Sequence, residues 1–151
     1  MTSHTVESES AQKILTSLTD FYRLLDSVSL PQLSQIYHSQ VVFIDPVGQH
    51  DGIAALENYF RQLLKTVNYC RFDIQQTQAI NDSATLVWRM DYSHPALKRG
   101  RALSLQGISH LRIEENRVIY QRDYYDLGAM LYEHIPLLGH AVKALKARLK
   151  T

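Results

Sequence analysis

The sequence of 151 residues lacks most of the features that assign a chain to a functional class at once. It contains a single cysteine, Cys70, so no disulfide can form within the chain. It has no run of apolar residues long enough to cross a membrane. Its 16 basic and 15 acidic residues nearly cancel, which removes the electrostatic argument for binding nucleic acid. We therefore expect one cytoplasmic domain that associates with neither nucleic acid nor a membrane.

Motifs that hold metals and cofactors are missing as well. The seven histidines show no metal-binding spacing, and the sequence has no glycine-rich phosphate loop and no Gly-x-Ser-x-Gly turn. We expect neither a metal nor a cofactor. The opening MTSHTVESES is polar and acidic, unlike a secretory signal, so we expect a flexible arm over residues 1–10 and a single domain over 11–151.

The hydrophobic pattern changes from helical to alternating along the chain. Apolar residues recur every three or four positions in the first part and every two positions in the second. The expected helices span about 11–25, 29–37 and 52–67, with a strand at 40–45; further strands span about 69–79, 84–93, 101–113 and 117–126, before a helical segment from 127 that is interrupted at 136–139. This order predicts an α+β fold in which N-terminal helices wrap a cone-shaped, curved antiparallel sheet that encloses a cavity.

An Arg-x-Asp sequence lies in the strand around residue 90. Alternation puts Arg89 and Asp91 on one face and Trp88, Met90 and Tyr92 on the other. If the apolar face is the core, both charged residues are simply solvated, which is the ordinary meaning of such a pair. If a second copy of the chain covers the apolar face, the pair points into the cavity, and this second interpretation predicts a homodimer.

Asp123 offers a partner for these charges, because it shares a strand face with Gln121 and Tyr125. Two carboxylates held apart by an arginine can act as one acid and one base, since their surroundings separate their pKa values. An apolar lining interrupted by a few polar groups is typical of a small-molecule pocket. The ligand-binding candidates on the same faces and at the pocket mouth are Phe43, Leu103, Leu105, Ser109, Tyr125 and Met130.

Asp45 is a third carboxylate, at the end of the strand 40–45 in the stretch DPVG. Two interpretations are open for it. It is either a base that faces the pocket or a residue that caps the following turn through its own side chain.

The segments WRMDY, GISHLRI and QRDYYDL, within about 88–127, resemble the limonene epoxide hydrolase branch of the nuclear-transport-factor-like, or SnoaL-like, superfamily. The resemblance implies that Asp123 is a base that activates water, that Asp91 is the acid, and that Arg89 bridges them. The order of elements agrees with this superfamily over about residues 11–138.

Two departures from that hydrolase point to the ketosteroid isomerase relatives. The hydrolase holds its water with a tyrosine and an asparagine where this chain has Phe43 and Asp45. The stretch DPVG is similar to that of the isomerases, which implies that Asp45 shuttles a proton and that Tyr22 donates to the enolate oxygen. Those isomerases have a second acid where Ser109 stands.

The sequence leaves two classes of function open. The first is an enzyme that acts on a small apolar or amphipathic molecule by carboxylate acid–base chemistry, either epoxide hydrolysis or an isomerase-like or cyclase-like proton transfer. The second is a non-catalytic module for ligand binding or dimerisation.

Overall fold

The computed structural model describes residues 3–150, with side chains from residue 9 onward. Three helices come from the first part of the chain: α1 (Ser3–Arg23), α2 (Leu33–Ile36), which a single 3₁₀ turn at Leu30–Gln32 precedes, and α3 (Ile53–Thr66). Each buries its apolar stripe. Leu15, Leu18 and Phe21 do so in α1, and Leu56 and Phe60 in α3.

The helix α1 begins earlier than the sequence predicted. It starts at Ser3, so residues 3–10, predicted as part of a flexible arm, are helical. The hydrophobic pattern missed this segment because its side chains are polar, whereas an established helix adds further turns at the gain of one hydrogen bond per residue.

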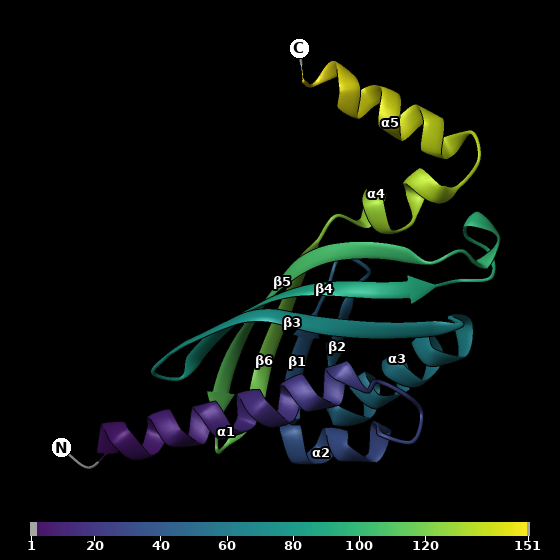
Figure 1. Ribbon diagram of the computed structural model, residues 1–151. Helices are drawn as coiled ribbons and strands as arrows, with labels where there is room; N and C mark the ends of the chain where they lie inside the picture. Colours follow the sequence, from purple (N-terminus) through teal and green to yellow (C-terminus); the bar gives the residue numbers. More distant parts are fainter. Residues whose placement is uncertain (1–2, 151) are drawn as a thin grey trace.

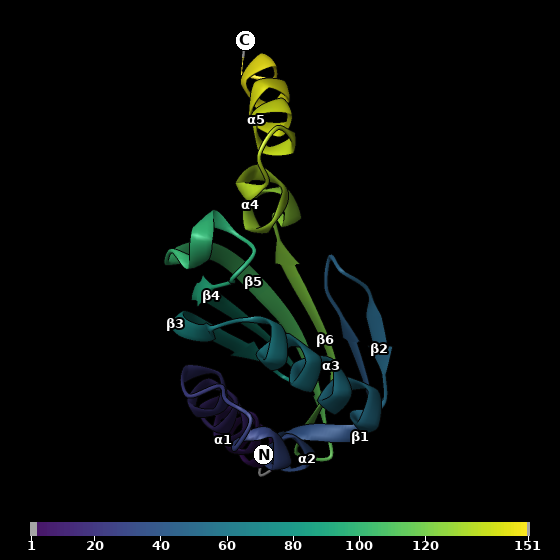
Figure 2. The ribbon, with the colours of Figure 1, turned by 90° about the vertical axis from the view of Figure 1, so that its right-hand side faces the viewer.

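The sheet has six strands: β1 (Tyr37–Ile44), β2 (Gln49–Asp51), β3 (Tyr69–Ile80), β4 (Ser83–Ser93), β5 (Leu103–Glu114) and β6 (Arg117–Tyr125). Their order is β2-β1-β6-β5-β4-β3, and all neighbours are antiparallel except β1 and β6. The sheet curves around the helices α1, α2 and α3 (Figures 1 and 2). The predicted α+β architecture is confirmed.

The chain after the sheet forms α4 (Leu127–Met130), a 3₁₀ turn (Tyr132–His134) and α5 (Leu138–Arg148). An interruption is present near the predicted 136–139, but it ends at Leu137, which has a φ of 69°, because α5 begins at Leu138. The helix α5 extends beyond the sheet, away from the N-terminal helices (Figures 1 and 2). Lys146 of α5 forms ion pairs with the segment that precedes this helix. Its Nζ lies 2.6 Å from Asp126 Oδ2 and 3.5 Å from Glu133 Oε2. None of the helices over residues 3–150 has the length and apolar character needed to span a bilayer.

Candidate functional site

A cavity of about 350 Å³ lies between the concave face of the sheet and the helices. Its size is within the range of small-molecule pockets. Most of its wall is apolar and comes from residues such as Phe60, Leu63, Phe72, Trp88 and Met90. The polar wall residues include two carboxylates, Asp45 and Asp123, which come from the neighbouring strands β1 and β6. The cavity therefore surrounds a small acidic region with apolar surface.

Asp123 receives two hydrogen bonds, and both reach the same oxygen. Ser109 Oγ donates to Asp123 Oδ1 at 2.5 Å, and Gln121 Nε2 donates to it at 2.9 Å. Ser109 in turn accepts a hydrogen bond from Trp88 Nε1 at 2.9 Å, which fixes the direction of its hydroxyl. The other oxygen, Oδ2, has no donor among the described residues, so it is the one left for a ligand.

Burial raises the pKa of Asp123 to about 6, and the charge of Asp45 adds to this effect. The hydrogen bonds from Ser109 and Gln121 act in the opposite direction, because they stabilise the ionised carboxylate. A pKa close to neutrality suits a group that takes up and returns a proton.

Tyr22 lines the cavity, but its hydroxyl proton already takes part in a hydrogen bond within the protein. Tyr37 OH donates to Gln121 Oε1 at 2.6 Å, and Tyr22 OH lies 2.7 Å from Tyr37 OH. Since the proton of Tyr37 points to Gln121, Tyr22 must donate to Tyr37 rather than to a ligand. Burial raises the pKa of both phenols well above their usual range, so both are neutral.

Asp45 caps the turn that follows β1. Its Oδ1 accepts hydrogen bonds from the backbone N–H of Val47 at 2.8 Å and of Gly48 at 3.0 Å. Its Oδ2 accepts a hydrogen bond from the Tyr59 hydroxyl. The turn-capping interpretation is confirmed, although Asp45 also lines the cavity. Both of its oxygens are occupied, unlike those of Asp123.

Tyr125 is the phenol with a free hydroxyl at this site. It lines the cavity on the same strand face as Asp123, and it makes no hydrogen bond with a described residue. Burial and the nearby charges of Asp45 and Asp123 raise its pKa, which keeps the hydroxyl protonated as a donor.

Arg89 and Asp91 lie outside the site, which corrects the sequence interpretation. They form an ion pair of 3.2 Å on the convex face, with side chains 44% and 42% exposed, and neither lines the cavity. The opposite face of β4 carries Trp88 and Met90, which bury more apolar surface and therefore take the concave side. The predicted triad with Asp123 does not form.

The remaining predicted residues are divided between the cavity and the core. Phe43, Tyr125 and Met130 line the cavity, and Ser109 contacts it through Asp123. Leu105 is buried and Leu103 is partly buried in the core, but neither lines the cavity.

Three further residues belong to the site although the sequence did not indicate them, namely Tyr59, Trp88 and Gln121. The position of Gln121 on the same strand face as Asp123 is a signal that could have indicated it, whereas Tyr59 lies on the apolar stripe of a helix and carries no signal that separates it from the core. Within residues 3–150, no three histidine, cysteine, aspartate or glutamate side chains are placed to hold a metal ion.

Comparison with known families places this geometry in context. Residues 18–121 match the model of the SnoaL-like domain. The chain belongs to the SnoaL-like domain family. The prediction of the SnoaL-like, or nuclear-transport-factor-like, superfamily is thus confirmed. A search of curated proteins finds no match to the sequence.

Solved structures of other SnoaL-like and related domains share the fold. An NTF2-like protein of unknown function from Burkholderia pseudomallei is 13% identical, with a TM-score of 0.71 over 81% of this chain and 95% of its own. A putative SnoaL-like polyketide cyclase from Jannaschia is 12% identical, with a TM-score of 0.71 over 82% and 90%. AclR, a putative hydroxylase from Streptomyces galilaeus, is 14% identical, with a TM-score of 0.67 over 95% and 96%.

Proposed function

We propose that this SnoaL-like domain is an enzyme that moves a proton at a carbon next to a carbonyl group in a small apolar or amphipathic molecule. The observation that carries the proposal is Asp123, a carboxylate with a pKa of about 6 and one free oxygen, in a cavity with mostly apolar walls. The similar structures described as a polyketide cyclase and a hydroxylase support a small-molecule enzyme of cyclase type.

The mechanism uses Asp123 as the base and Tyr125 as the donor to the developing oxyanion. Asp123 Oδ2 removes the proton from carbon, the carbon–hydrogen electron pair moves into an enolate, and Tyr125 donates a hydrogen bond to the enolate oxygen. Return of the proton to a different carbon gives an isomer. Attack of the enolate carbon on a second carbonyl closes a ring, and Asp123 then returns the proton to the new alkoxide.

Tyr125 takes the role that the resemblance to ketosteroid isomerases implies for Tyr22. Tyr22 donates to Tyr37, whereas the Tyr125 hydroxyl has no partner among the described residues. Asp123 likewise takes the role of base in place of Asp45, because Asp45 already accepts hydrogen bonds from Val47, Gly48 and Tyr59.

Epoxide hydrolysis is a less well supported form of the same chemistry. It requires an acid opposite the base, and Arg89 and Asp91 lie on the convex face. A neutral phenol such as Tyr125 would have to protonate the epoxide oxygen, and a raised phenol pKa makes it a weak acid.

The test is a turnover screen of unsaturated ketones, diketones and epoxides with matched variants. We expect Asp123→Asn to lower kcat by about 10²–10⁴-fold, and Tyr125→Phe by about 10²–10³-fold. Asp91→Asn removes a carboxylate from the convex face and should leave turnover unchanged. We also expect kcat/KM to rise with pH through about 6 and then level off, because the base must be ionised.

Turnover that survives Asp123→Asn would contradict the mechanism. Tight ligand binding without turnover of any compound class would instead favour the second candidate, a non-catalytic ligand-binding module, which the apolar cavity of about 350 Å³ also supports.

A cytoplasmic location remains part of the proposal. It rests on the single cysteine, Cys70, which is buried and unpaired, as is common in a reducing compartment.

A further inference from the structure

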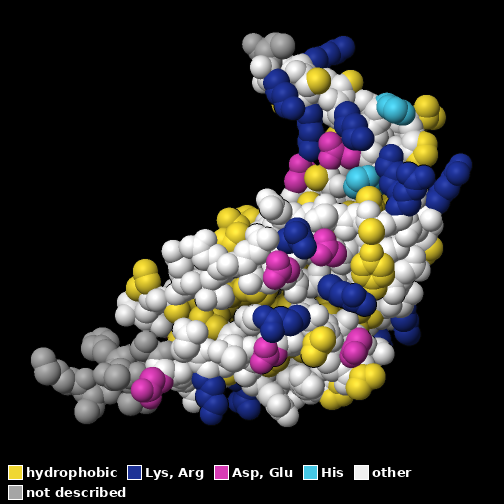
Figure 3. Space-filling view, in the orientation of Figure 1, with side chains coloured by type: hydrophobic (Ala, Val, Ile, Leu, Met, Phe, Trp, Pro, Cys, Tyr) yellow, Lys and Arg dark blue, Asp and Glu magenta, His cyan; other side chains and the backbone are white. Residues whose placement is uncertain are grey.

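A second pocket, of about 340 Å³, lies where the loop after β4 meets the start of α5. Cationic and imidazole side chains dominate its polar wall. They come from two segments far apart in the sequence, and they are Lys98, Arg99, His134, His140 and Lys143. Figure 3 shows lysine, arginine and histidine side chains gathered where the body of the molecule meets the protruding C-terminal helix.

The positive charges of this pocket are only partly balanced by the described side chains. Lys98, Arg99 and Lys143 form no ion pair with any side chain of residues 9–150. Glu133 also lines the pocket, and its carboxylate forms an ion pair with Lys146, whose Nζ lies 3.5 Å from Glu133 Oε2. The pocket therefore keeps an excess of positive charge.

The backbone holds two of the cations in an unusual conformation. Lys98 has a φ of 49° and Arg99 a φ of 56°, in the left-handed region that residues other than glycine rarely adopt. Hydrogen bonds from Gly100 N to Leu97 O at 3.0 Å and from Arg101 N to Lys98 O at 3.2 Å fix this turn. Such strained positions concentrate at ligand sites, where the surrounding structure holds them.

His134 supplies a polar group without a partner. Its Nδ1 is buried, and no described residue forms a hydrogen bond with it. Close packing brings α5 to this histidine, because Gly139 contacts the backbone of Glu133 so tightly that a Cβ would lie 3.3 Å from Glu133 Cα and nearer still to its carbonyl. His134 thus adds to the pocket wall a ring with one nitrogen that the described residues leave without a hydrogen bond.

Two chain segments, the loop after β4 and the segment after β6, contribute residues to both the second pocket and the apolar cavity. In the loop after β4, His94 and Leu97 line the cavity, whereas Ala96 and Lys98 line the second pocket. After β6, residues 130–131 line the cavity and residues 133–136 the second pocket. A molecule that occupies the cavity and extends along these two segments would approach the cations of the second pocket.

We propose that the second pocket binds an anionic group, a phosphate or a carboxylate. The group belongs either to a small free anion or to the charged end of a molecule whose apolar part fills the cavity. The latter case deepens the proposed function, on which it rests, because it restricts the substrate to apolar molecules with an anionic end.

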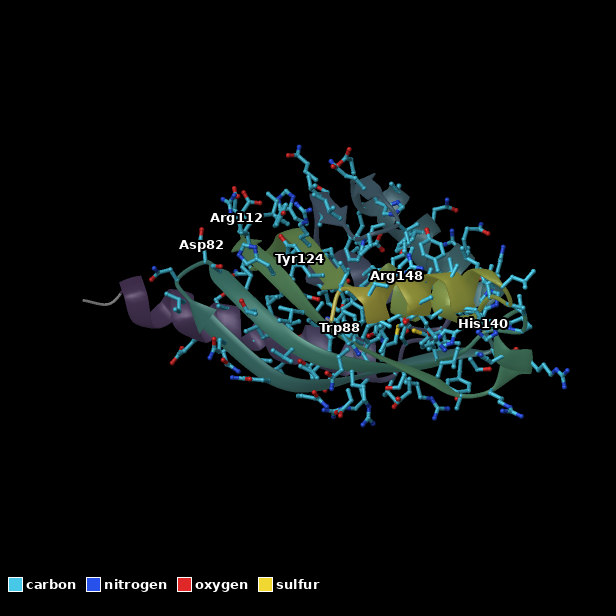
Figure 4. The ribbon with its side chains drawn as sticks, turned by 90° about the horizontal axis from the view of Figure 1, so that it is seen from above. Asp82, Trp88, Arg112, Tyr124, His140 and Arg148 are labelled. Carbon is cyan, nitrogen blue, oxygen red and sulfur yellow. The ribbon has the colours of Figure 1, made fainter. Side chains whose placement is uncertain are left out.

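The first arm of the test measures pyrophosphate binding by titration calorimetry. The double variant Lys98→Gln/Lys143→Gln should bind pyrophosphate at least about tenfold more weakly than wild type, since each lysine supplies a charge-assisted hydrogen bond. The control Lys13→Gln/Arg112→Gln removes the same charge from exposed positions and should stay within about twofold of wild type. Figure 4 shows Arg112 at the opposite end of the molecule from His140.

The second arm compares two fluorescent dyes with the same aromatic body, anilinonaphthalene sulfonate and the neutral phenylnaphthylamine. If the anion is part of the cavity ligand, wild type prefers the sulfonate by about tenfold, the lysine double variant loses that preference, and the control keeps it. The affinity for the neutral dye should be equal in all three proteins.

A lysine-dependent effect in the first arm identifies a free anion, and one in the second arm identifies an amphipathic ligand. If the double variant matches the control in both arms, the anion site is overturned. Neither arm measures turnover, so failure of the proposed enzymatic function is distinguishable from failure of this inference.

Discussion

Asp123 receives hydrogen bonds from Ser109 and Gln121 on one oxygen, and its side chain lines a cavity with mostly apolar walls. These surroundings have opposite effects on its charge. The donors stabilise the ionised form, but burial outweighs them and raises the pKa. The ionised carboxylate is thus kept at a cost to the folded state, as is common for groups whose role is in function rather than stability.

This cost makes the free energy of unfolding depend on pH. The pKa of Asp123 is about 6 in the folded protein, whereas an aspartate in an unfolded chain has its ordinary value of 3.8. The folded state therefore binds the proton more tightly than the unfolded state does. Its contribution to stability is therefore full below about pH 4, falls as pH rises, and is lost above about pH 6. The difference corresponds to roughly 3 kcal/mol at most.

Asp123→Asn should remove this dependence. As the pH rises from 4 to 8, we expect the free energy of unfolding of the variant to increase by about 2–3 kcal/mol relative to that of wild type. Urea unfolding at each pH measures this difference. Asp91→Asn controls for loss of a carboxylate on the convex face. An equal gain in both variants would show that general charge repulsion, not burial of Asp123, is responsible.

At this scale the sequence indicated only some of the site. Asp123 was found because a charged residue at the end of a strand stands out, and Phe43 and Tyr125 followed by alternation. Arg89 and Asp91 were misplaced because alternation defines two faces of a strand but not which face is the interior. Tyr59 was missed because a tyrosine on a helical stripe is indistinguishable from core until Asp45 lies beside it.

Between elements, the packing of β4 on β5 decides the shape of the site. Trp88 pairs with Gly107 across the two strands, and its indole donates to Ser109, which holds Asp123. Trp88 is buried, and it lines the cavity on the concave side of the sheet. The absence of a side chain at Gly107 gives the ring the space it occupies.

Gly107→Ala should therefore displace Trp88. The added Cβ would lie 2.9 Å from Trp88 Cε2 and closer to two other ring carbons, so the indole must move or the strands must separate. We expect a loss of about 1–3 kcal/mol in the free energy of unfolding. The fluorescence of Trp88, the only tryptophan in the chain, should change in the folded protein as well.

Gly48→Ala is the matched control, because nothing lies within 4 Å of a Cβ at that position. Its stability and fluorescence should match those of wild type. A Gly107→Ala protein with unchanged fluorescence would show that the ring does not depend on this space.

Periodicity predicted the main elements and failed where it carries no information. The strands β3 to β6 and the helix α3 contain enough alternating or helical apolar residues to be recognised. The strand β2, Gln49–Asp51, is three polar residues long, and only its pairing with β1 makes it a strand. The first residues of α1 are polar as well, and for that reason the sequence predicted them as a flexible arm.

For the whole molecule, the convex face replaces the concave one as the candidate dimer surface. The prediction of a homodimer used Trp88, Met90 and Tyr92, which face the interior. A different apolar row crosses the convex face, where Val87 pairs with Ile108 and Ile108 pairs with Tyr124. Ile108 is 44% and Tyr124 52% exposed.

We propose that a second copy of the chain covers this row, since an apolar row crossing three strands can meet its own copy about a twofold axis. Ile108→Lys should convert a dimer to a monomer in sedimentation equilibrium. Ile80→Lys, at an exposed position at the turn between β3 and β4, should leave the mass unchanged. A monomeric wild-type protein, or a dimer that tolerates Ile108→Lys, would contradict this interface.

The sequence by itself determined the class of fold, because the periods of its apolar residues fix which segments are helices or strands and which side chains share a face. It also pointed to Asp123 and Asp45. Only the tertiary structure decided which face is enclosed, and that choice depends on the apolar area that the whole sheet and its helices bury together. The same choice put Arg89 and Asp91 on the surface and surrounded Asp123 with Ser109, Gln121 and an apolar wall.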